Sequence, residues 1–356
     1  MLKVTFDNKQ SSFFKDLKDK VDQYFLNKKL DPTGNGSLYF KGIIQVLSAA
    51  GLYLTLIFFT PGYPLAIFLC VLLGINLAVI GFNVMHEGGH QSFSKHSWLN
   101  KASAYSLNVL GGNSYFWKIK HNVNHHTYTN IEGMDSDIDV RPFMRLHEGQ
   151  PRYWFHRFQH VYWVLLYGIS YVTWIFYDDF AKYFSGRIAI NSAPKKLESK
   201  EHFIFWITKV TYVGVYIILP IALVGWLQAL VGFAIITFVC GLSISIVFQL
   251  AHMVEGTQFP VPDENSHRMK QEWAIHQMNT TANFATGNKV ISWLLGGLNF
   301  QIEHHLFPRI SHVHYPKISK FVKETCKEYN VEYIEYSSLL KAFCSHLFHI
   351  RRLGLS

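Results

Sequence analysis

Four long apolar runs constrain the fold of this chain more than any other feature of its sequence. They lie at roughly 43–60, 64–85, 203–224 and 228–250. Each is long enough to cross a bilayer, which takes about 20 residues of α-helix. The runs come in two pairs, joined by the short uncharged turns TPGYP and VGWLQ. We therefore expect an all-α integral membrane protein with four transmembrane helices arranged as two hairpins.

The composition agrees with a membrane protein. Hydrophobic residues make up 49% of the chain and charged residues only 16%, against roughly 25% charged residues in soluble domains. The net charge of +9 raises the possibility of nucleic-acid binding. No basic run interleaved with aromatic residues is present, so nucleic acid is not expected as a partner.

The basic residues predict the orientation of the chain in the membrane. Outside the two hairpins the chain is rich in Lys and Arg: Lys15, Lys18, Lys20, Lys28, Lys29 and Lys41 before the first, Lys118, Lys120, Arg141, Arg145, Arg152 and Arg157 between the two, and Lys289, Arg309, Lys317, Lys320 and Lys323 after the second. By the positive-inside rule these segments and both termini are cytoplasmic, and the turns face outward. A soluble protein with four buried helices, the alternative, would not produce this asymmetry.

A fifth run, at 158–177, is rich in aromatic residues and also long enough to cross. If it crossed, the histidines after residue 250 would lie on the opposite side of the membrane from His86 and His90. We therefore expect it to lie in the interface, where belts of Trp and Tyr are common; a fifth span is the alternative. Residues 11–28 have the pattern of an amphipathic helix, and DPTGNG at 31–36 breaks the chain before the first hairpin.

The chain has 19 histidines, and most of the informative ones lie in three motifs. These are H-E-x-x-H (His86, Glu87, His90), H-x-x-x-H-H (His121, His125, His126) and Q-x-x-H-H (Gln301, His304, His305), with His252 at the end of the fourth run and His276 beyond it. On a helix, residues four apart share a face, so each pair at that spacing can hold one metal ion. Neighbouring histidines point about 100° apart and can reach two metal ions.

The first motif by itself is the signature of a zinc protease, in which the glutamate activates water. A catalytic zinc needs only three protein ligands and one open position. Seven motif histidines, with His252 and His276, are too many for one zinc ion and suit two metals of higher coordination. Glu87 is then expected to orient a ligand histidine rather than to act as a general base.

Three such motifs around two membrane hairpins resemble the membrane fatty-acid desaturases, over about residues 40–320. Gln301 at the start of the third motif is similar to the front-end (Δ5/Δ6, linoleoyl-CoA desaturase-like) members, which act between the carboxyl end and an existing double bond. The resemblance implies three segments: an N-terminal cytoplasmic amphipathic segment at 1–40, a desaturase domain at 41–320 and a C-terminal cytoplasmic tail at 321–356. The domain would carry its histidine-rich di-iron centre as a cytoplasmic cap.

The resemblance also implies a ligand set for two iron ions, with no catalytic group separate from the metal site. The metal ligands would be His86, His90, His121, His125, His126, His252, His304 and His305. His276, Gln301, Glu87 and His312 would be further ligands or support the ligands from outside. Histidines without motif context, namely His96, His147, His156, His160, His202, His267, His346 and His349, are expected at the surface or interface.

By the same resemblance, the chain would use O₂ to place a cis double bond, at Δ6 or Δ5, in an acyl-CoA or acyl-lipid substrate. The acyl tunnel would be walled by the second and fourth spans and by residues 285–300. The chain has no H-P-G-G heme motif, so an external donor, ferredoxin or cytochrome b5, is expected. A bacterial inner (plasma) membrane fits the absence of a targeting segment; the endoplasmic reticulum is the alternative.

Two other functions are compatible with the motifs. A fatty-acid hydroxylase or acetylenase could use the same irons, because fold and motif do not determine the reaction outcome. A non-catalytic membrane metal-binding protein is the alternative from another class. Such a carrier would place its ligands along a path through the membrane, whereas here the candidate ligands are all expected on one side.

Overall fold

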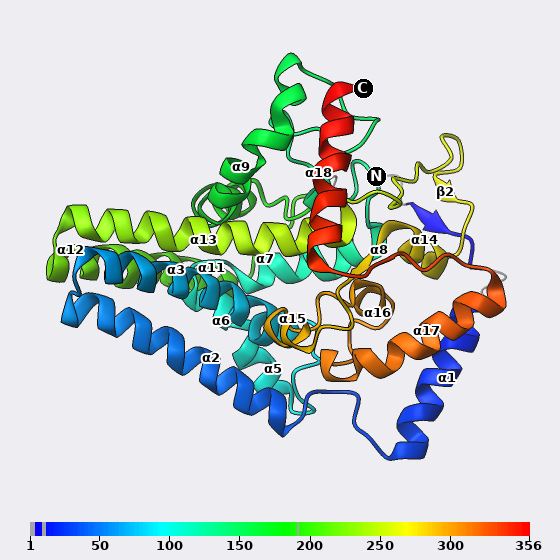
Figure 1. Cartoon of the computed structure of the whole chain (residues 1–356), viewed down its shortest axis with the longest axis horizontal. Helices are drawn as coiled ribbons and strands as arrows, with labels where there is room; N and C mark the ends of the chain where they lie inside the picture. Colours follow the sequence, from blue (N-terminus) through cyan, green and yellow to red (C-terminus); the bar gives the residue numbers. More distant parts are fainter. Residues whose placement is uncertain (1–3, 9–11, 191) are drawn as a thin grey trace.

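The computed structural model describes residues 4–8, 12–190 and 192–356. Within them, four helices are long and apolar enough to span a membrane, as predicted, and they run side by side in one half of the molecule (Figure 1). They are α2 with η1 (Gly36–Leu54, Thr55–Phe59), α3 with η2 and α4 (Tyr63–Ile80, Gly81–Met85, His86–Gly89), α11 with η7 and α12 (Ser199–Val213, Gly214–Ile218, Leu219–Val224), and α13 (Trp226–His252).

The spans are longer than the apolar runs indicated. The second continues to Gly89 and the fourth to His252, so each carries a candidate metal-binding histidine, His86 or His252, on its last turn. The first span begins at Gly36, where the Asn35 side chain accepts hydrogen bonds from the amides of Ser37 and Leu38. Lys41, expected before the first span, lies inside it and is buried. The polar DPTGNG segment ends in a helix cap, which is why the helix starts earlier than hydropathy alone suggested.

The amphipathic helix predicted over 11–28 is α1 (Ser12–Lys28); residue 11 lies outside the described residues. Its buried residues Phe13, Leu17, Val21 and Phe25 recur every four positions. They pack with α17 (Tyr315–Tyr329) in an apolar cluster that also includes residues of α14 (Trp273–Thr280) and α16 (Gln301–Leu306). This layer lies at one end of the four spans, on the right of the view in Figure 1.

The aromatic run at 158–177 forms most of α9 (Gln159–Thr173) and η6 (Trp174–Asp178), followed by α10 (Asp179–Ser185). In the described part of the chain this helix is not among the four that meet the length and apolarity of a span. It crosses α13 closely, since a Cβ on Gly241 would lie 2.6 Å from the carbonyl oxygen of Gly168. Small residues allow helices to approach in this way.

The last helix, α18 (Leu339–Leu355), packs on α9 and on η5 (Trp154–Phe158). Here the expectation that histidines outside the motifs lie at the surface is wrong for four of them, because His147, His156, His346 and His349 are buried. Three of these imidazoles pair with backbone carbonyls, namely His156 with Pro142 at 2.8 Å, His346 with Met253 at 2.7 Å and His349 with Leu146 at 3.2 Å. A neutral imidazole satisfied in this way can be buried at little cost.

The remaining elements are short. The helices and turns are α5 (Ser97–Ala104), α6 (Ser106–Val109), α7 (Ser114–Lys118), η3 (Ile119–His125), α8 (His126–Tyr128), η4 (Ser136–Ile138), α15 (Lys289–Leu294) and η8 (His312–His314). Two parallel two-residue ladders were not anticipated. They pair β1 (Thr5–Phe6) with β2 (Arg268–Met269) and β3 (Asn283–Phe284) with β4 (Glu335–Tyr336). Each ladder joins segments that are distant in sequence around the histidine motifs.

Candidate metal centre

The histidine motifs meet where the membrane helices end. His86 and His90 lie at the two ends of α4, on the last turn of the second span, and His252 is the last residue of α13. His121 and His125 lie on the π-helical turn η3, and His304 and His305 on α16. A second π-helical turn, η2, directly precedes His86. Among the described residues, π-helical turns also occur outside the histidine groups at η1, η6 and η7, so this geometry does not by itself mark the site.

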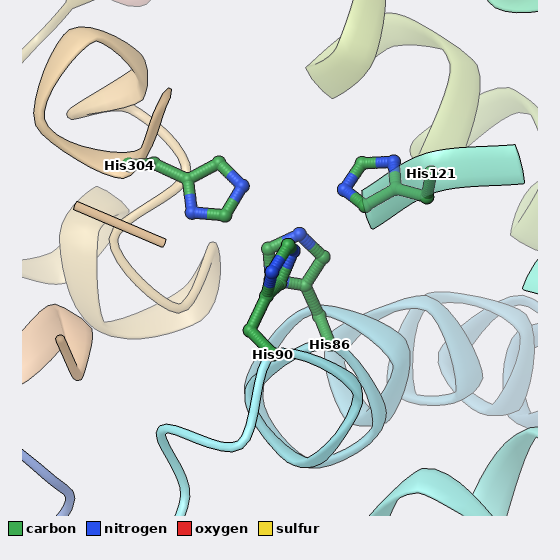
Figure 2. A group of neighbouring side chains, drawn as sticks. All are labelled: His86, His90, His121 and His304. Atoms are coloured by element: carbon green, nitrogen blue, oxygen red, sulfur yellow. The ribbon is translucent and has the colours of Figure 1, made fainter. Parts of the chain in front are cut away.

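Four histidines form a first group. The ligand atoms of His86, His90, His121 and His304 all lie within 4.8 Å of one another. Figure 2 shows their rings converging from three separate parts of the chain on one common space. This arrangement is suited to holding a metal ion.

A second group consists of His125, His252 and His305, whose ligand atoms also lie within 4.8 Å of one another. His126 lies between the groups, with Nε2 3.2 Å from Nε2 of His121 and its ring stacked on that of His305 at 4.4 Å. Gln301 adjoins the second group, with Nε2 3.3 Å from Nε2 of His252. All eight histidines expected as ligands therefore lie in or between two adjacent groups.

The residues present fit a bound metal. Nε2 of His90, His125, His304 and His305 is buried and has no hydrogen-bond partner among the described residues. Burial, and then the proximity of other histidines, holds the pKa of His90, His121, His304 and His305 well below the usual value. These imidazoles are therefore neutral and offer lone pairs. Buried polar atoms without partners are costly, and a metal ion would satisfy several of them at once.

Residues outside the two histidine groups fix the orientation of the candidate ligand rings. Nδ1 of His125 lies 2.9 Å from Oδ2 of Asp135, and Nδ1 of His305 lies 2.8 Å from Oε1 of Gln277. Nδ1 of His304 lies 3.1 Å from the Tyr315 hydroxyl, and Nδ1 of His252 lies 3.2 Å from the carbonyl oxygen of Thr280. With Nδ1 engaged outward, Nε2 of each ring faces the cluster. Partners of this kind orient metal-binding histidines and raise their basicity.

Sequence reasoning missed these supporting residues. Asp135 follows His125 by ten positions, in the acidic stretch MDSDID, a signal that could have been used. Asp137 is also close, at 3.8 Å from Nδ1 of His125, and forms an ion pair with Lys120. Nothing in the sequence around Gln277 or Tyr315 marks either residue as a partner of the third motif.

The residues expected to support the ligands lie in different places. Glu87 contacts His312, with Oε1 2.8 Å from Nδ1 of the imidazole and 3.0 Å from the backbone nitrogen that donates to it. Its other oxygen accepts a hydrogen bond from the Ser92 hydroxyl. This pair joins the first motif to the segment after the third. His276 is buried against the ring of Phe6 and belongs to neither metal-binding group.

Trp117 forms part of the wall of the first group. Its indole stacks on the His121 ring at 4.5 Å with an interplanar angle of 20°. It also lies 5.7 Å from the rings of His86 and His90. A Cβ on Gly89 would overlap the indole, so the close approach requires glycine at that position.

An apolar cavity of about 590 Å³ lies between the four spans. Its lining extends along the second span from Tyr63 to Leu77 and includes Tyr53, Tyr171 and Tyr212 from other helices. Leu77 precedes His86 by nine residues, about 13 Å along a helix at 1.5 Å per residue. All four spans contribute to the lining, whereas residues 285–300 do not. The volume lies in the range of ligand pockets.

Comparison with known proteins gives a consistent result. The family model described as fatty acid desaturase matches residues 62–337. An sn-1 linoleoyl-lipid 6-desaturase of Arthrospira platensis is 34% identical, covering 99% of this chain and 95% of that protein. A protein of the same name from Synechocystis is 33% identical, covering 99% and 98%. An acyl-lipid (8-3)-desaturase of Physcomitrium patens is 32% identical, covering 98% and 73%.

Proposed function

The chain belongs to the fatty acid desaturase family, and we propose that within it this protein is a front-end enzyme forming a cis double bond at Δ6 or Δ5. As a member of the family it is an oxidoreductase that introduces a double bond into a fatty acyl chain. The relatives are named as 6-desaturases or, in Dictyostelium discoideum, as a Delta(5) fatty acid desaturase. Their names support an unsaturated acyl lipid as the substrate.

The observation that carries this proposal is the pair of adjacent histidine groups. We propose that His86, His90, His121 and His304 hold one iron and that His125, His252 and His305 hold the other. His126 lies close enough to both groups to complete either set, and Gln301 adjoins the second. Bound iron, with O₂, would supply the oxidising power that removal of hydrogen from an unactivated CH₂ demands and that no side chain provides.

The protein itself would position the acyl chain and exclude water. The apolar cavity between the spans would take the methyl-terminal part of the acyl chain, and Trp117 would wall the space beside His121. In the overall reaction the acyl CH₂–CH₂ unit gives up two hydrogens, and an external donor gives two electrons. Together with two protons from solvent these reduce O₂ to two waters. Small displacements of the reacting carbons would sharply reduce the rate.

We also propose how the chain is arranged in the membrane. The four spans form two hairpins, residues 158–177 lie in the membrane interface, and the histidine groups and both termini face the cytoplasm of a bacterial inner membrane. Segment 1–40 and the tail 321–356 flank a desaturase domain at 41–320. The basic segments outside the spans support this orientation. They also suit an acidic electron donor, a ferredoxin or a cytochrome b5.

A feeding experiment tests the function. The chain would be expressed with a compatible electron donor and supplied with linoleate, and new double bonds would be located by mass spectrometry. His304→Ala should abolish the product, whereas His96→Ala, outside both groups, should not. A hydroxylated product would instead favour the hydroxylase alternative. Metal binding without product and without O₂ consumption would favour a non-catalytic metal-binding protein.

A further inference from the structure

The buried face of the first span carries two polar residues that the metal site does not use. The buried residues of α2 are Leu38, Lys41, Gly42, Gln45 and Ala49. Lys41 is 6% exposed and Gln45 is 3% exposed. Because they are one turn apart, their side chains project from the same face of the helix. Polar residues buried within membrane spans are costly and usually functional.

Gln45 has no hydrogen-bond partner for its side chain among the described residues. Both Nε2 and Oε1 are buried and unpaired. An unpaired buried amide destabilises the fold relative to an apolar side chain of the same shape. Stability alone therefore favours leucine at this position, and a glutamine needs another explanation. An amide with two free N–H donors is suited to binding an oxygen atom of a ligand.

Lys41 connects this position to the metal site. Its Nζ lies 3.3 Å from Nε2 of His312, whose Nδ1 lies 2.8 Å from Oε1 of Glu87, the residue next to His86. The ammonium also sits over the Trp293 ring of α15, 5.0 Å from the ring centre. An ammonium group has three donors. His312 and the ring leave at least one of them available to a further acceptor.

We propose that Lys41 and Gln45 bind the carbonyl oxygen at the carboxyl end of the acyl substrate. This inference rests on the proposed desaturase function and adds the group that anchors the substrate. A front-end enzyme places the new double bond at a fixed number of carbons from the carboxyl end. It must therefore hold that end at a fixed distance from the metals. The five bonds from the carbonyl carbon to carbon 6 extend over about 6 Å, at roughly 1.2 Å per bond as in an extended backbone.

The location suits a substrate that arrives from the membrane. Lys41 and Gln45 lie within the first three turns of the span, at the end near the metal site. The neighbouring helix α15 exposes Val290 and Trp293 by 67% and 47%, and these apolar surfaces are suited to contact lipid. A lipid ester and a CoA thioester both present this carbonyl acceptor.

Gln45→Leu is the decisive variant. It removes an amide that no described residue bonds, so a purely structural role predicts equal or greater stability and an unchanged product. If Gln45 anchors the substrate, kcat/KM should fall roughly tenfold or more. In addition, the double bond should spread over neighbouring positions of the chain. Lys41→Met should act in the same direction, and Ser48→Ala, which faces Asn76 one turn further along α2, should leave both readouts unchanged.

The assay would present the same acyl group as a glycerolipid in vesicles and as a CoA thioester, and locate double bonds by mass spectrometry. Iron content and thermal stability would be measured for every variant, so that loss of the metal site is recognised. One of the two substrates, the glycerolipid or the CoA thioester, should be converted by the wild-type protein and converted more slowly by Gln45→Leu. That substrate identifies the source of the carbonyl. If Gln45→Leu with full iron content keeps the wild-type regiochemistry and kcat/KM, the carbonyl site at Lys41 and Gln45 is refuted, and the proposed desaturase function is not affected. A wild-type protein that desaturates neither form would refute the proposed function instead.

Discussion

The carboxylate of Asp135 lies 2.9 Å from Nδ1 of His125, and both side chains are fully buried. Asp135 also accepts hydrogen bonds from the backbone amides of Asn130 and Asp137, so its position is fixed from several sides. A carboxylate on the outer nitrogen orients the imidazole and makes its inner nitrogen a better metal ligand. This contact links a loop residue outside the motifs directly to the second histidine group.

Asp135→Asn should therefore weaken metal binding by about 10- to 100-fold, the usual cost of losing such a partner. The change preserves shape and removes the charge. Metal affinity would be measured by competition with a chelator of known affinity. Asp139→Asn is the matched control, because Asp139 pairs with Arg141 near the surface. Equal affinities for the two variants would contradict a supporting role for Asp135.

The two histidine groups should lose their metals separately. His304 belongs to the first group and His305 to the second, so either alanine variant leaves the other set of ligands intact. Each should reduce bound iron from two ions to about one per chain, measured by elemental analysis of purified protein. His96→Ala should retain both ions. Complete loss of iron in both variants would show that the groups form one cooperative site.

Removing the metal should destabilise the fold. Without it, buried imidazole nitrogens have no partner among the described residues. A ligand that binds only the folded state stabilises it by about 4 kcal/mol at 1,000 times its dissociation constant. A chelator should thus lower Tm by several degrees, and added Fe²⁺ should restore it. In a variant carrying both His304→Ala and His305→Ala, the chelator should lower Tm by less than in the wild-type protein. An equal decrease in Tm would mean that the chelator acts elsewhere on the protein.

The contact between Gly89 and Trp117 predicts a suppressor pair. In Gly89→Ala the new methyl group overlaps the indole, which must then move off His121. Desaturase activity should fall sharply and iron content moderately. Adding Trp117→Phe makes room and should recover part of the iron content. No recovery in the double variant would mean that the defect of Gly89→Ala lies in its own helix.

Filling the cavity between the spans should change the length of acyl chain that is accepted. A Cβ on Gly232 would lie 3.5 Å from Sγ of Cys70, an ordinary contact, so Gly232→Leu would place its side chain in the cavity. Conversion of linoleate should fall relative to that of shorter chains, measured with a mixture of acyl lengths. Gly51→Leu is the control, since nothing lies within 4 Å of a Cβ there. An unchanged length profile would remove the cavity from the substrate path.

The spans and the motifs could be predicted from the sequence, because both depend on residues that are close together along the chain. Hydropathy is a sum over neighbouring residues, so four membrane-length helices could be predicted, although their ends could not. The first span starts earlier than its apolar run because the Asn35 cap, rather than hydropathy, sets its beginning. The spacing of His121 and His125 likewise predicted a shared face, and the two lie together on η3.

The composition of each histidine group, and the residues that support its rings, depend on how distant segments pack together. His121 and His125 lie four positions apart on one turn and meet together with Asp137, yet their other histidine partners differ. Those of His121 come from α4 and α16, and those of His125 come from α13 and α16. The contacts of Asp135, Gln277 and Tyr315 with ligand rings arise from packing between distant segments, which no local pattern encodes. The same holds for Lys41, which resembled a residue flanking the membrane and is instead buried beside His312.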